Sequence, residues 1–255
     1  MKDFFTTTQT RPPQIPLPYY LVMLMVLVLL AYLSWSWHAK KSWRLTFLGV
    51  QAVQLISLYI WYIWQGFPLD DSLPLYHCRL AMLSLLLLKD SKVKTYFALM
   101  GLVGGSCAII HPIFDPYDFP HISSISFIIG HYALLVNSLN YLLRTYKTHP
   151  ISKNMIVTLT LLLNLGLVVV NHFVNGNYGL LRHTPFISDA WLPIKYLAVS
   201  GALIFLMIVM KKGLEYFEEK YWINEGTRHQ RVDSVFFHFI CFILTQNAFR
   251  IAFTL

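Results

Sequence analysis

Long apolar runs, separated by short polar segments, dominate the chain. A helix of about 20 apolar residues crosses a hydrocarbon core roughly 30 Å thick. The third run is short and is expected to extend toward its polar flanks. The pattern predicts an all-α, polytopic membrane protein whose seven transmembrane helices form one domain over residues 1–210. The predicted helices span residues 17–37, 43–64, 73–88, 95–112, 122–143, 155–173 and 191–210.

The remaining segment, residues 211–255, forms a different pattern. Leu214, Phe217 and Tyr221 fall on one helical face among charged residues, which is typical of an amphipathic helix lying on a membrane surface. Residues 235–255 are apolar at first and polar toward their end. This stretch fits an eighth span or a second surface helix equally well, so we expect a membrane-associated C-terminal tail.

The positions of the charged residues predict which side of the membrane each loop faces. Only 13% of residues are charged, against about 25% in soluble domains, and the net charge is +8. Lys and Arg mark cytoplasmic loops, so the N-terminus is expected outside, in a multi-pass protein of the cell membrane, specifically a bacterial plasma membrane. The expected partners are membrane lipids, with no nucleic acid. Basic loops hold Lys40, Lys41, Arg44, Lys89, Lys92, Lys94, Arg144, Lys147 and Lys153, and the alternate loops hold Asp70, Asp71, Asp115, Asp118 and Asp189.

Two polar residues at membrane depth suggest chemistry. With a rise of 1.5 Å per residue, Cys78 lies about 8 Å and His131 about 15 Å below the outer surface. They can meet if their helices are neighbours and the third helix is set low. A thiol beside an imidazole can perform acyl transfer. The alternatives are a small core cysteine and a structural histidine that hydrogen-bonds a partner.

Other polar residues on the outer half could have either a functional or a structural role. Arg79 can favour a thiolate, hold a lipid phosphate or extend outward to water. Asn164, Asn171 and Asn175 share one helical face and are expected to hydrogen-bond neighbouring helices. Residues 115–121 are rich in Pro, Asp and aromatic side chains, which predicts a non-helical lid over the outer end.

The order of several short motifs resembles the YwaF family of integral membrane proteins, a group that includes the animal transmembrane protein 164. The resemblance extends from the second to the seventh apolar run. Two positions depart from the family pattern: Tyr76 stands where the family tends to have His, and Ile113 where it tends to have Asp. The motifs are Leu73-Pro74-Leu75 with Cys78, Phe119-Pro120-His121 with His131, and Asn177-Tyr178 with Pro185.

The resemblance implies a lipid acyltransferase or acyl hydrolase with Cys78 as nucleophile and His131 as base. No cofactor is expected, and the acceptor is open among a lysolipid, a glycan hydroxyl and water. The candidate substrate-binding residues are Arg79, His77, Phe119, His121, Asn171, Asn177 and Tyr178.

Two rival functions remain open. Several histidines fall on the outer half, which is compatible with a metal-dependent hydrolase, although no pair has the i, i+4 spacing of a helical zinc motif. We therefore expect no metal. Seven helices also fit a transporter, a receptor or an assembly scaffold, because fold alone does not define function.

Overall fold

The computed structural model describes residues 4–184, 187 and 189–222, with side chains as far as residue 216. Every regular element in this part of the chain is helical, and six of its helices are long and apolar enough to cross a membrane. The structure therefore confirms a polytopic all-α membrane protein. The elements are α1 (Leu17–Trp37), α2 (Lys41–Trp64), α3 (His77–Leu87), α4 (Lys92–Ile110), α5 (Ile122–Thr145), α6 (Lys153–Val174), the 3-10 turn η1 (Tyr178–Leu180) and α7 (Leu192–Trp222).

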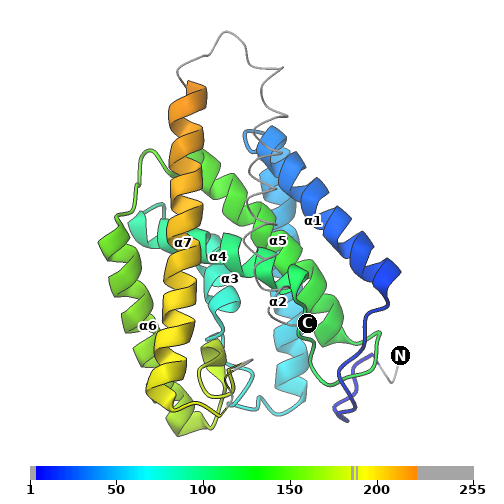
Figure 1. The fold of residues 1–255 in the computed structure, drawn as a ribbon. Helices are drawn as coiled ribbons and strands as arrows, with labels where there is room; N and C mark the ends of the chain where they lie inside the picture. Colours follow the sequence, from blue (N-terminus) through cyan, green and yellow to red (C-terminus); the bar gives the residue numbers. More distant parts are fainter. Residues whose placement is uncertain (1–3, 185–186, 188, 223–255) are drawn as a thin grey trace.

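The helices α4 and α5 form the centre of the bundle. They pack against each other, α5 also contacts α1 and α2, and α3 packs mainly on α4. Helices α6 and α7 cover one side and α1 lies on the other (Figure 1). These outer helices expose apolar side chains such as Met25, Leu165 and Leu197, which suits contact with lipid chains.

Capping residues mark where several helices begin or end. Ser91 and Ser152 accept hydrogen bonds from backbone N–H groups of the first turns of α4 and α6, at 3.2 and 3.1 Å. Asn175 ends α6 with a φ of 61°, a left-handed conformation that asparagine tolerates. It therefore belongs to the cap of the helix rather than to the expected face with Asn164 and Asn171.

The third segment differs from the sequence expectation. The apolar run suggested a helix from about residue 73, whereas α3 begins at His77 and has only 11 residues. At 1.5 Å per residue it is about 16 Å long, roughly half of a hydrocarbon core. Residues 66–76 form turns because Pro68 and Pro74 lack backbone N–H groups.

The segment after the seventh apolar run also differs. We expected a separate surface helix from residue 211, but α7 continues unbroken to Trp222 and projects beyond the other helices (Figure 1). Its buried positions continue in phase through Met207, Met210 and Leu214, and Lys211 pairs with Glu215 one turn later. The possible eighth span at 235–255 lies outside the described residues.

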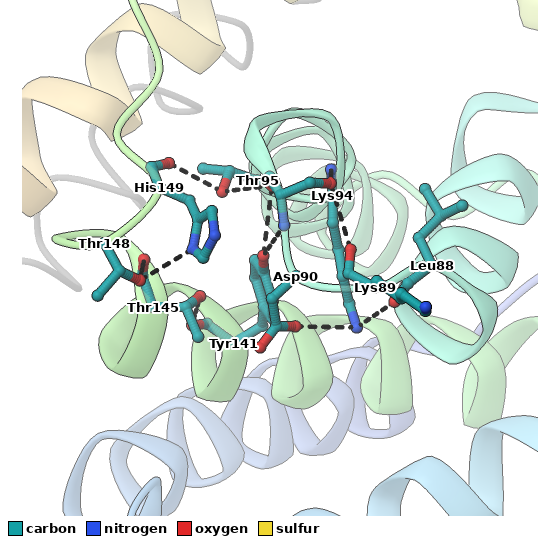
Figure 2. A network of polar contacts seen from close by, with 10 residues as sticks. Leu88, Lys89, Asp90, Lys94, Thr95, Tyr141, Thr145, Thr148 and His149 are labelled. Carbon is teal, nitrogen blue, oxygen red and sulfur yellow. Dashed lines mark hydrogen bonds and ion pairs between the residues drawn. The ribbon is translucent and has the colours of Figure 1, made fainter.

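A polar network joins the turn between α3 and α4 to the end of α5 (Figure 2). Lys94 contacts the Asp90 carboxylate at 3.5 Å and donates to the Leu88 carbonyl at 2.8 Å, and its ammonium lies 5.0 Å from the Tyr141 ring. Thr95 donates to the carbonyl of His149 at 3.1 Å. These contacts hold one basic end of the bundle together.

Candidate functional site

The short helix α3 places Cys78 in its first turn. The chain reaches this point as irregular backbone, and the helix begins only at His77. The first N–H groups of a helix have no acceptor within it and carry partial positive charge. Tyr76, at the N-cap, offers no side-chain hydrogen bond to them. Cys78 therefore lies beside the backbone N–H groups at the start of a helix, which have no acceptor within the helix.

Two adjacent glycines of α4 contact the segments that carry Cys78 and His131. A Cβ atom added at Gly104 would lie 2.7 Å from the Cys78 sulfur, which is closer than contact distance. A Cβ added at Gly105 would lie 3.1 Å from the His131 carbonyl oxygen and 3.2 Å from the Leu135 nitrogen. The two candidate residues therefore approach α4 at consecutive positions, from α3 and α5.

The imidazole of His131 is held in one tautomer. Its Nδ1 lies 2.7 Å from the Phe127 carbonyl oxygen, so Nδ1 must carry the proton that is donated. The neutral ring then keeps a lone pair on Nε2. The Phe127 ring lies 4.3 Å away between centroids and limits rotation of the imidazole. Cys78 and His131 both have intermediate residue exposure.

Arg79, the residue after Cys78, does not extend freely to the surface. Its Nη1 donates to the backbone carbonyl oxygens of Asp71 at 2.7 Å and of Leu73 at 3.5 Å. Its Nη2 donates to the Tyr62 hydroxyl. The Tyr62 and Tyr76 rings lie 5.0 and 4.7 Å from the guanidinium carbon. Arg79 thus fixes the loop that enters α3.

The carboxylate of Asp71 completes this arrangement. It accepts hydrogen bonds from the Tyr62 hydroxyl at 2.9 Å and from the Tyr76 hydroxyl at 2.8 Å. Two tyrosines therefore connect the carboxylate to the guanidinium of Arg79. The negative charge offsets the buried positive charge, which would be costly to leave uncompensated. Sequence reasoning did not assign Asp71 or Tyr62 to the site, because the irregular backbone between α2 and α3 has no periodicity that would place these side chains together.

Tyr178 and Asn171 clamp the same loop from the other side. The Tyr178 hydroxyl donates to the Leu69 carbonyl at 2.7 Å and accepts from the Leu73 N–H at 2.9 Å. The Asn171 amide pairs with the backbone of Tyr178 through two hydrogen bonds of 2.8 and 2.7 Å. These groups already have partners, which favours a role in building the site over direct contact with substrate.

His77 and Asn177 are also engaged in the scaffold. The His77 Nε2 donates to the Asn164 side-chain oxygen at 2.7 Å, and Asn164 donates to the Ser200 hydroxyl at 2.8 Å. This chain ties α3 to α6 and α7, as expected for a membrane asparagine that joins helices. The Asn177 side chain accepts the backbone N–H groups of Arg182 and His183 at 3.0 and 2.9 Å and orders the turn before α7.

The loop before α5 packs under the N-terminal segment. His121 is buried, donates from Nε2 to the Thr6 carbonyl at 3.1 Å, and accepts the Ser123 N–H on Nδ1 at 3.2 Å. Burial lowers the pKa of His121. Phe119 points outward with 59% of its surface exposed. The predicted lid is thus a folded loop whose outer surface carries Phe119.

Asp115 lies on the inner side of this loop. Burial, reinforced by the nearby charge of Asp71, raises the pKa of Asp115 to about 6. Arg79 and a hydrogen bond with Ser123 oppose this change. Within the described residues, His, Cys, Asp and Glu side chains form no group of three or more that could hold a metal ion.

Comparison with known proteins places the chain in a family. A model of the TMEM164 family matches residues 4–211, which is well over half of the chain and includes every candidate site residue. Searches of the curated proteins and of the solved structures each found no match. The family match supports the resemblance to transmembrane protein 164. It does not confirm the name YwaF for the family. This multi-pass membrane protein therefore belongs to the TMEM164 family.

Proposed function

We propose that this protein is a membrane acyltransferase or acyl hydrolase that acts on a lipid ester, with Cys78 as nucleophile and His131 as base. The observation that carries the proposal is the packing of the Cys78 sulfur and the His131 backbone against consecutive glycines of α4. The tautomer of His131 adds support, because its Nε2 lone pair is the atom that a general base requires.

The reaction would proceed in two steps. A thiol in apolar surroundings rests with its proton, so a base must remove it during attack. As the Cys78 sulfur bonds to the ester carbonyl carbon, Nε2 of His131 takes the thiol proton. The bond to the leaving alkoxide then breaks and the imidazolium returns the proton to it, leaving an acyl thioester. An acceptor hydroxyl or water reverses these steps, and the thiol is restored.

Backbone groups at the start of α3 are suited to the developing oxyanion. The N–H groups of the first helical turn point out of the helix end and belong to residues adjoining the nucleophile. Preorganised donors of this kind can contribute about 3 kcal/mol to transition-state stabilisation. We prefer these backbone donors to the side chains of Asn177, Tyr178 and Arg79, since those side chains have other partners.

The test uses purified full-length protein in lipid vesicles with a labelled phospholipid as acyl donor. Cys78→Ala and His131→Ala should each abolish turnover, and the double variant should be little worse, because the pair acts as one unit. Wild-type protein should gain an acyl mass on the peptide containing Cys78, and neutral hydroxylamine should remove it. The exposed His172, changed to Ala, is the matched control and should retain activity.

Three outcomes would decide against the proposal. Full turnover by Cys78→Ala would show that the thiol is not the nucleophile. Turnover that survives Cys78→Ser and is lost on chelation would support the metal-dependent hydrolase instead. Absence of lipid turnover by folded wild-type protein across donor classes, with Cys78 replaceable in cells, would favour a transporter, receptor or scaffold.

A further inference from the structure

A second thiol lies next to the one proposed as nucleophile. Cys107 follows Gly104 by three residues on α4, and residues three apart in a helix are neighbours on one face. Gly104 is also the residue whose added Cβ would lie 2.7 Å from the Cys78 sulfur. The face of α4 that contacts Cys78 therefore also carries Cys107. The two cysteines thus lie on helices that pack against each other.

Both cysteines are free of disulfides in the structure. Both residues are partly exposed. Gly104 between them is partly exposed as well, although α3 and α4 pack closely elsewhere. The absence of a side chain at Gly104 leaves the sulfur of Cys78 room to turn toward the next helical turn.

We infer that Cys78 and Cys107 form a reversible disulfide, so that Cys107 is an oxidative modification site that masks Cys78. A disulfide requires Cα atoms about 4.4–6.8 Å apart, which two helices in close contact through a glycine can provide. The disulfide itself is independent of the proposed function. Its consequence, loss of acyl transfer under oxidation, rests on that function.

The oxidation balances with a peroxide as oxidant. The sulfur of Cys78 attacks one peroxide oxygen, the O–O bond breaks, and a sulfenic acid and water form. The sulfur of Cys107 then attacks the Cys78 sulfur, the S–O bond breaks, and a second water leaves with the proton of the Cys107 thiol. Two thiols and one hydrogen peroxide thus give one disulfide and two waters. A dithiol reductant reverses the change by thiol–disulfide exchange.

The experiment treats purified full-length protein with hydrogen peroxide, blocks remaining thiols, and measures the intact mass and the linked peptides. Wild-type protein should lose two hydrogen atoms and yield a Cys78–Cys107 linked peptide, and dithiothreitol should restore both thiols. Cys107→Ala and Cys78→Ala should give no linked peptide. Cys241→Ala is the matched control and should behave as wild type.

Activity is measured on the same samples. Oxidised wild-type protein should lose turnover and recover it with dithiothreitol, whereas oxidised Cys107→Ala should lose turnover that dithiothreitol does not restore, because its Cys78 sulfenic acid has no second thiol to resolve it and oxidises further. Failure of wild type to form the linked peptide would overturn the inference and leave the proposed function standing. A linked peptide in a protein that lacks turnover before oxidation would refute the proposed function and retain the thiol pair.

Discussion

Single residues show how burial changes the ionisation and hydrogen bonding of polar side chains. Asp115, Asp71 and Arg79 come from different segments, yet their charges act on one another. Asp71 has two tyrosine hydroxyls as donors, whereas Asp115 is left with Ser123. Two aspartates of the same cluster therefore have different hydrogen-bonding environments.

The raised pKa of Asp115 makes stability depend on pH. Its carboxyl changes from an ordinary pKa of 3.8 to about 6 on folding, so the folded state binds the proton more tightly. Between about pH 4 and pH 6 the unfolded state loses the proton first, and stability should fall as pH rises. We expect a loss of about 1–2 kcal/mol, reduced because the side chain is partly exposed.

Asp115→Asn should remove this part of the pH dependence and raise the melting temperature above pH 6. The measurement is thermal unfolding in detergent across the pH range for wild type and variant. Asp118→Asn, an exposed acid of the same loop, is the control. An unchanged slope in Asp115→Asn would show that the carboxyl is not buried on folding.

At the scale of elements, α4 is the helix through which α3 and α5 are positioned. Its glycines permit close approach on two sides, with Gly104 toward α3, Gly105 toward α5 and Gly101 in contact with both. The short α3 cannot cross a bilayer alone and depends on this contact and on the anchored loop before it. The catalytic geometry we propose is thus a consequence of helix packing.

Gly105→Ala should separate α4 from α5. The new Cβ would meet backbone atoms at 3.1 and 3.2 Å, and backbone cannot rotate away as a side chain can. We expect a destabilisation of about 1–3 kcal/mol and a loss of turnover larger than the loss of folded protein explains.

The control is Gly166→Ala on α6, where an added Cβ has no atom within 4 Å. This change should leave turnover intact and slightly favour the helix. Melting temperature and lipid turnover are measured on both variants. Equal behaviour of the two would mean that the approach of α4 and α5 does not position the site.

For the whole molecule, the bundle has two distinct ends. Helices α1 and α7 begin at the end where α6 terminates (Figure 1), and the Arg79 cluster and the loop before α5 belong to that end as well. The opposite end carries the lysines around the turn between α3 and α4 (Figure 2). From the Lys and Arg bias we propose that this second end faces the cytoplasm.

The orientation predicts which residues react with an impermeant maleimide on intact cells. In a background without native cysteines, Asp70→Cys and Asp118→Cys should be labelled, because both positions are exposed at the outer end. Lys92→Cys, exposed at the other end, should be labelled only after the membrane is permeabilised. Reversed labelling would place the site on the cytoplasmic side and require substrate from the inner leaflet.

Local pattern alone established several properties of this protein. Apolar runs of bilayer length predict helices because backbone N–H and C=O groups in lipid must be paired within the segment. The all-α membrane class, most helix positions and the candidates Cys78 and His131 followed from this. The family match supports the class and the transmembrane protein 164 resemblance, while the activity remains a proposal.

Only the tertiary structure decided how the site is built. The late start of α3, the partners of Arg79 and the unbroken length of α7 became evident only in the structure. The same holds for Tyr178, whose hydroxyl meets Leu69 and Leu73 more than 100 positions earlier. Such pairs leave no periodic signal in the sequence, because the polar groups are satisfied across the fold and not within their own segments.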